Sequence, residues 1–85
     1  MNYTLRVSNS FERRLRKLSK VDRERVWRLL HEIEQSPHSY KALSGHLTGT
    51  HSARVGGLRI IYAIDENEKL IVLLSVGHRE SVYER

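Results

Sequence analysis

Cysteine is absent from the sequence, so neither a disulfide framework nor thiolate chemistry is available to this protein. The chain also lacks any apolar run near the roughly 18 residues that a membrane span requires, which predicts a soluble protein. Residues 1–7 are too few and too polar for a signal peptide. These absences together favour a cytoplasmic location.

Several sequence signatures of catalysis are missing as well. There is no glycine-rich phosphate-binding loop, no HExxH motif and no Cys/His cluster with zinc spacing. His46 and His51 lack an evident third ligand, so we interpret them as polar loop residues and expect neither a metal nor a cofactor.

Negative charge is scarce and unevenly placed. Fifteen Lys and Arg against ten Asp and Glu give a net charge of +5, which favours polyanionic partners: nucleic acid, an acidic protein or a membrane surface. Residues 36–64 contain no acidic side chain, so this stretch can face RNA without local repulsion. It carries the cationic or titratable residues His38, Lys41, His46, His51, Arg54 and Arg59.

The hydrophobic pattern predicts one α+β domain over residues 1–85. Residues 3–7 alternate as a strand does. Asn9, with Glu12 three residues later, predicts the start of one helix, and Ser19 with Asp22 the start of a second, which Pro37 ends. With almost no linker between them, the two helices should form an antiparallel hairpin.

The remainder of the chain predicts strands. Residues 52–55 and 58–64 flank Gly56-Gly57, a glycine pair that supplies the positive φ of a tight turn. After a turn at 65–68, residues 69–76 are apolar on both faces, which predicts a central strand, and residues 77–85 form a polar tail. The expected order is β-α-α-β-β-β, a helical hairpin packed on a mainly antiparallel sheet whose last three strands form a meander.

Arginines are placed around these strands. Arg54 and Arg59 flank the glycine turn, Arg79 follows the last strand, and Tyr83 lies four residues beyond it. On the sheet face away from the helices, such arginines form a cationic floor that grips RNA and stabilises charge on phosphorus without a metal. The alternative is that Arg54 and Arg59 are solvated strand residues that balance acidic side chains of the next turn.

Two segments resemble the C-terminal signatures of the RelE/ParE toxin superfamily. Residues 54–62 (RVGGLRIIY) are similar to its R-V-G-x-x-R-x-x-Y hairpin, and residues 75–83 (SVGHRESVY) to its V-G-[HK]-R…V-Y ending. The N-terminal strand, the basic helices and an L-x-G loop also follow in the expected order. The resemblance implies a RelE-like fold and a ribosome-dependent mRNA endonuclease.

The resemblance also implies roles for individual residues. Arg59 contacts the scissile phosphate, Arg79 lies near the leaving 5′-oxygen, and Arg54 completes the cationic floor. Tyr83 stacks on a base or helps to deprotonate the 2′-hydroxyl, a task for which His78 is the alternative because imidazole titrates near neutrality. Strongly cleaving members usually carry Lys or Arg two residues before the position of Arg54, where this chain has a serine.

Further cations and aromatic residues allow two interpretations each. The basic helix residues are either a solvated surface or a surface that docks on ribosomal RNA. Trp27 is expected at the rim of the core, and Tyr62 is expected to pack within a strand. The candidate RNA- or ribosome-binding residues are Arg13, Arg14, Lys17, Lys20, His51 and His78.

Three functions follow from the resemblance. The first is an endonuclease that cuts mRNA in the ribosomal A site and leaves a 2′,3′-cyclic phosphate. The second is a ParE-like toxin that inhibits DNA gyrase without cutting nucleic acid, and the third is a degenerate toxin, for which Ser52 is the best support. Under all three, the expected partner is a RelB-like antitoxin; the first adds the ribosome and mRNA.

Overall fold

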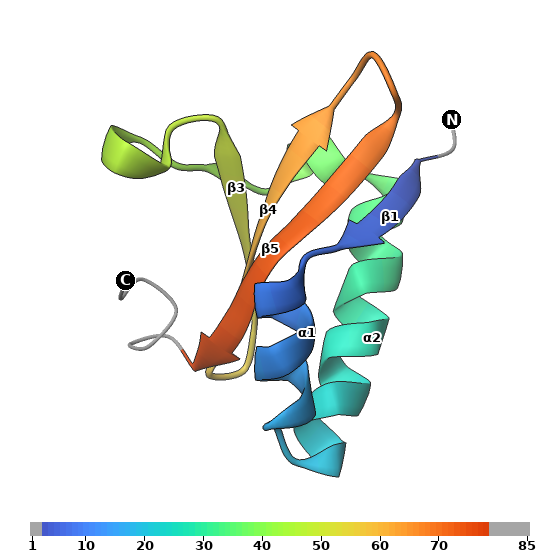
Figure 1. Cartoon of the computed structure of the whole chain (residues 1–85), viewed down its shortest axis with the longest axis vertical. Helices are drawn as coiled ribbons and strands as arrows, with labels where there is room; N and C mark the ends of the chain where they lie inside the picture. The colour runs from blue at the N-terminus through green and yellow to red at the C-terminus, as the bar shows by residue number, and fades with distance from the viewer. Residues whose placement is uncertain (1–2, 79–85) are drawn as a thin grey trace.

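The computed structural model describes residues 3–78 and contains two helices and one five-stranded sheet (Figure 1). Two short 3₁₀ turns, η1 (Pro37–Ser39) and η2 (Gly45–Leu47), interrupt the connection between α2 and β3. The elements are β1 (Thr4–Val7), α1 (Asn9–Arg16), α2 (Lys20–Gln35), β2 (Lys41–Ala42), β3 (Thr50–Val55), β4 (Leu58–Asp65) and β5 (Leu70–His78).

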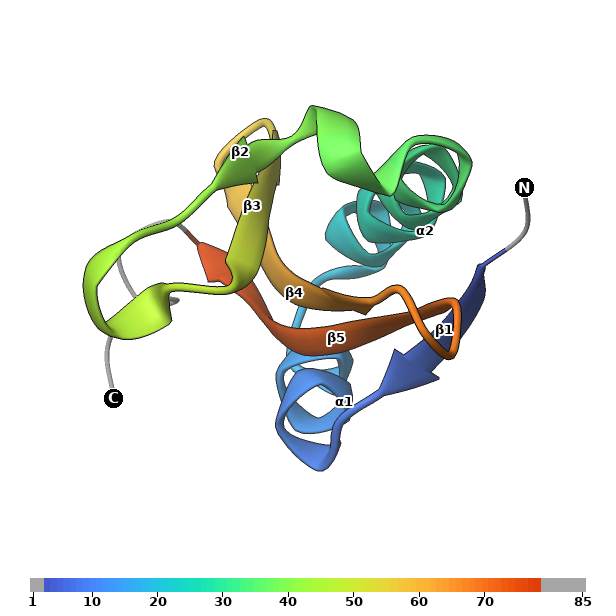
Figure 2. The ribbon, with the colours of Figure 1, turned by 90° about the horizontal axis from the view of Figure 1, so that it is seen from above.

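The strands lie in the order β1-β5-β4-β3-β2, with β1 parallel to β5 and every other pair antiparallel. This confirms the predicted α+β fold with its C-terminal meander. The apolar segment after residue 69 is an interior strand, as predicted. Two details differ from expectation. Residues 40–49, where the sequence pattern indicated no strand, contain the two-residue strand β2 (Figure 2), and β5 extends through Gly77 and His78 instead of ending at Val76.

Serine hydroxyls begin both helices. Ser19 caps α2 by accepting a hydrogen bond from the backbone N–H of Asp22 at 3.1 Å, as predicted. The prediction for α1 was wrong by one residue, because Ser8 rather than Asn9 is the cap and accepts from the N–H of Phe11. Ser8 also donates to the carbonyl of Leu74 on β5, so this strand sets its position.

The core lies between α2 and one face of the sheet, while α1 runs along β5 (Figures 1 and 2). Alternate residues of β3, β4 and β5 point toward α2, whose apolar stripe meets them. Burial of this surface is the main force that holds the layers together. The buried cluster consists of Phe11, Val26, Leu29, Leu30, Ile33, Ala53, Leu58, Ile60, Tyr62, Ile71, Leu73 and Val76.

Tyr62 confirms its predicted packing role. Its ring has no exposed surface, and its hydroxyl donates a 2.7 Å hydrogen bond to the carbonyl of Pro37. Burial raises the pKa of Tyr62 well above the ordinary value of a phenol. Trp27 is more exposed than a rim position implies, with 57% of its surface accessible.

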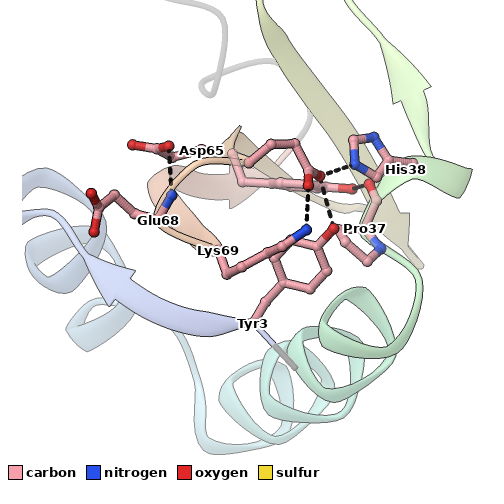
Figure 3. A network of polar contacts seen from close by, with 8 residues as sticks. Tyr3, Pro37, His38, Asp65, Glu68 and Lys69 are labelled. Atoms are coloured by element: carbon pink, nitrogen blue, oxygen red, sulfur yellow. Dashed lines mark hydrogen bonds and ion pairs between the residues drawn. The ribbon is translucent and has the colours of Figure 1, made fainter. Parts of the chain in front are cut away.

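The β4–β5 turn is fastened to the start of the chain by Glu66. Its carboxylate accepts 2.8 Å hydrogen bonds from the hydroxyl of Tyr3 and the ammonium of Lys69, and also contacts His38 of η1 (Figure 3). These donors lower the pKa of Glu66 to about 2. The acidic β4–β5 turn and the end of α2 therefore lie together, at the end of the molecule opposite the β3–β4 turn (Figure 1).

The β3–β4 turn contains the two predicted glycines, but only one of them needs a left-handed conformation. Gly56 has φ +59°, whereas Gly57 is not among the residues with positive φ. A side chain at Gly56 would therefore be strained. Within residues 3–78, no helix is both long and apolar enough to cross a membrane.

Candidate functional site

Arg54 and Arg59 stand directly opposite each other on β3 and β4. The neighbouring row, Ala53, Ile60 and Val76, belongs to the core beneath α2. Because successive side chains on a strand point to opposite faces, the two arginines lie on the face away from α2. Arg54 is exposed, whereas only 8% of the Arg59 surface is accessible.

The next row on this face contains Ser52, Ile61 and Ser75. Ser52 is 6% and Ile61 3% exposed, so the surface beside the arginines is closely packed. Ser52 occupies the position where strongly cleaving relatives are expected to carry a cation. Lys41 of β2 is the register partner of Ser52 and is exposed, so the cations of this face include Lys41 as well as the arginine pair.

A cavity of about 590 Å³ lies at the end of β5, close to the row that contains Arg54 and Arg59. It lies between α1, the start of α2 and the last residues of β5, and Gly77 on its wall is the register partner of Arg59. In Figure 1 these elements meet at the lower end of the molecule, near the β3–β4 turn. Four predicted RNA-binding residues line this one cavity: Arg13, Arg14, Lys17 and His78.

One carboxylate also lines this cationic cavity. Asp22 lies with Oδ1 3.4 Å from Nη1 of Arg25 and Oδ2 3.8 Å from Nε2 of His78, and its side chain is only 18% exposed. Arg25 in turn reaches the β3–β4 turn, where its Nη1 is 3.6 Å from the position that a Cβ on Gly56 would take. From the sequence, Asp22 was noted only as part of a helix start and Arg25 only as one of the basic helix residues, so neither was a candidate for this site. Their i, i+3 spacing behind the Ser19 cap was the available signal.

The other two predicted RNA-binding residues lie elsewhere. Lys20 is exposed at the start of α2 but does not line the cavity. His51 lies on the helix-covered face, stacked on Tyr62 at a centroid distance of 5.5 Å, with His38 edge-on at 6.1 Å. Burial, together with repulsion from His38, lowers the pKa of His51.

Two predicted catalytic residues, Arg79 and Tyr83, lie outside the described residues, so their roles remain predictions. Within residues 3–78, no group of three His, Cys, Asp or Glu side chains is arranged to hold a metal ion. What the described residues provide is a paired guanidinium row next to a cation-lined cavity. This arrangement suits a polyanion such as an RNA backbone.

Comparison with known proteins gives a consistent family. Residues 5–83 match the family model described as the ParE toxin of the type II toxin–antitoxin system parDE. The chain is 34% identical over 87 residues to toxin RelG of Mycobacterium tuberculosis, with all of both proteins covered.

Solved structures agree with this match. The toxin–antitoxin complex RelBE2 from M. tuberculosis contains a chain that superposes with a TM-score of 0.86 at 33% identity, covering 93% of this chain and 100% of that one. A mutant of the E. coli toxin RelE in complex with a peptide of its antitoxin gives a TM-score of 0.81 at 26% identity, covering 94% and 86%.

Proposed function

Since the chain belongs to the RelE/ParE superfamily and is a type II toxin–antitoxin toxin of the RelE family, we propose that it is a ribosome-dependent endoribonuclease that cuts mRNA in the A site. The observation that carries the proposal is the cross-strand pair of Arg54 and Arg59 on the sheet face away from α2. Like charges directly opposite each other weaken a sheet. A bound phosphate reverses this effect, because both guanidinium groups then donate to its oxygens.

The proposed reaction is an internal transfer at phosphorus. The 2′-oxygen bonds to the adjacent phosphorus while the bond from phosphorus to the next 5′-oxygen breaks, which leaves a 2′,3′-cyclic phosphate and a 5′-hydroxyl. Negative charge accumulates on the phosphorus oxygens in the transition state. Arg59 and Arg54 stabilise this charge, and each such positioned donor typically contributes about 10²–10³-fold in rate.

Two proton transfers complete the reaction. The 2′-hydroxyl gives up a proton, and the leaving 5′-oxygen receives one. Tyr83 or His78 accepts the first proton, and Arg79 supports the leaving oxygen. His78 is the register partner of the core residue Leu58 and lies 3.8 Å from Asp22 of α2, on the face opposite the arginine pair. This position favours Tyr83 as the acceptor.

The proposed partners follow from the same family. Solved relatives are complexes of RelE toxins with RelB antitoxins, which supports an antitoxin as the partner of this basic chain. We assign the ribosome and mRNA as further partners and the cytoplasm as the location. Arg13, Arg14, Lys17 and Lys20 dock on ribosomal RNA through phosphate contacts that position the toxin without reading sequence.

A second candidate function is supported by the family model, whose description names the parDE system. Under this alternative the chain inhibits DNA gyrase and cuts no RNA. The C-terminal Arg79 and Tyr83 favour the nuclease, because ParE-like toxins typically lack this pair.

The test is cleavage of an mRNA paused on purified ribosomes, with free mRNA as a parallel sample. We expect cuts only in the A site, 2′,3′-cyclic phosphate ends, and a loss of about 10²–10³-fold in Arg59→Ala and Arg79→Ala. Arg16→Gln, a charge-matched change on α1 outside the arginine row and the cavity, should cut normally. Absence of cleavage together with inhibition of gyrase supercoiling would establish the second function instead.

A further inference from the structure

The cavity between α1 and β5 has a chemical character of its own. Its cations come from different elements, with Arg13, Arg14 and Lys17 on α1 and His78 on β5. Donors that approach from several sides suit a tetrahedral phosphate better than a planar carboxylate. The guanidinium forks add paired donors that match phosphate oxygens.

The cavity also lies close to the arginine row. Gly77 on its wall is paired with Arg59 across the β4–β5 ladder, so the cavity begins one strand away from the Arg59 backbone. Neighbouring strands are about 4.8 Å apart, so the two sites are close enough for one RNA strand to reach both. A single RNA strand that lies on the arginine row and passes around the end of β5 brings a flanking phosphate to the cavity.

Asp22 gives this cavity an unusual feature, because a carboxylate lies among the cations that would bind the phosphate. It is within 3.4 Å of Arg25 and 3.8 Å of His78, and it is held in place by its position on the first turn of α2. A bound phosphate would share the cavity with this charge and compete with it for His78. The carboxylate therefore opposes binding of the anion for which the surrounding residues are suited.

We propose that the cavity binds a phosphodiester group of single-stranded RNA, and that Asp22 is a built-in competitor that limits its affinity. The proposal rests on the proposed function for its ligand, RNA, but not on cleavage. A competing charge in a partly exposed site changes the affinity by about three- to tenfold at low salt, and by less as salt screens it. A toxin with such a residue releases RNA more readily than its positive charge alone would allow.

The experiment measures binding without cleavage. The probe is a fluorescent 2′-O-methyl hexanucleotide, which lacks the attacking hydroxyl, and the readout is anisotropy at low and at physiological salt. Arg14→Gln is expected to weaken binding about tenfold, whereas Arg16→Gln, on the same helix but outside the cavity, should weaken it about twofold. Asp22→Asn is expected to tighten binding three- to tenfold, whereas Glu24→Gln, an exposed acidic residue of α2 outside the cavity, should have little effect.

Several outcomes overturn the proposal. Equal losses in Arg14→Gln and Arg16→Gln would mean that only overall charge matters, and unchanged or weaker binding by Asp22→Asn would remove the competitor role. A glutamate peptide that binds as tightly, with the same pattern across the variants, would assign the cavity to a protein partner. Asp22→Asn also affects the start of α2, so a second measurement uses the unmodified protein. The backbone chemical shifts of Ser19 and Gly77, which line the cavity, should change when the probe binds.

The proposal and the proposed function can fail separately. A protein that binds the probe through the cavity but never cuts mRNA retains this inference and loses the nuclease. A protein that cuts in the A site with unchanged activity and RNA affinity in Arg14→Gln retains the nuclease and loses the cavity.

Discussion

Tyr62→Phe should destabilise the fold at neutral pH by an amount that disappears in alkali. The substitution keeps the buried ring and removes only the hydroxyl that donates to the carbonyl of Pro37 at 2.7 Å. A buried acceptor left without its donor costs about 1–2 kcal/mol, and no cavity is created because the ring volume is retained. For a chain of this length, the midpoint of thermal unfolding should fall by roughly 5–10 °C.

The pH dependence follows from the raised pKa of Tyr62, which results from burial and from charge repulsion with Tyr40. Above the ordinary phenol value of 10.0, the unfolded chain releases this proton while the folded protein retains it. The wild type therefore loses up to about 1.4 kcal/mol of stability per pH unit above that value, and the phenylalanine variant does not. The two free energies of unfolding should meet at roughly pH 11.

Urea unfolding followed by circular dichroism at pH 8, 10 and 11 measures this difference. Tyr3 and Tyr40 also have raised pKa values, but both remain in the variant, so their effect cancels. A variant as stable as the wild type at pH 8, or a difference that does not change with pH, would refute the reasoning. At a temperature well below the unfolding midpoint, the variant should also retain cleavage, because this phenol lies in the core.

Further predictions concern single side chains whose partners are known. Glu66→Gln should lower stability clearly at pH 7 and much less at pH 2, because donor contacts lower the pKa of this carboxyl to about 2. The stabilising contribution of the carboxylate is present above about pH 4.5 and is lost as pH falls toward 2. Urea titrations at both pH values test this. Ser19→Ala should cost about 1 kcal/mol of unfolding free energy, and Ser8→Ala about 2 kcal/mol since its hydroxyl also donates to a strand carbonyl; equal losses would contradict the assignment. Gly56→Ala should cost about 1 kcal/mol because of its positive φ, and Gly57→Ala clearly less, as measured by thermal unfolding.

Local patterns predicted the elements of this fold well because each has its own chemical signal. Ser19 and Pro37 mark the two ends of α2, and Gly56 marks the β3–β4 turn. The N-cap of α1 was placed one residue late because Asn9 and Ser8 are both good caps. Ser8 is selected by its second hydrogen bond to Leu74, a residue far away in sequence.

The candidate site was predictable in part. Register places Arg54 opposite Arg59, which alternation around a two-residue turn already implied. The cavity was not predictable, because β5 was expected to end before Gly77, and its extension brings His78 to Asp22. No periodicity in α2 indicates that a carboxylate from its first turn meets the end of a strand more than fifty residues later.

The parallel pairing of β1 with β5 has a consequence for how the chain folds. Thr4 pairs with Leu70, so both helices and strands β2, β3 and β4 lie between the two strands of this ladder in the sequence. Closing such a distant contact costs more loop-closure entropy than pairing β3, β4 and β5 through short turns, so we expect this ladder to form later. Because α1 directly follows β1 and packs along β5, we expect α1 to reach its final position only when β1 pairs with β5. We therefore expect the cationic cavity to be assembled late in folding, since a chain still short of β5 lacks part of its wall.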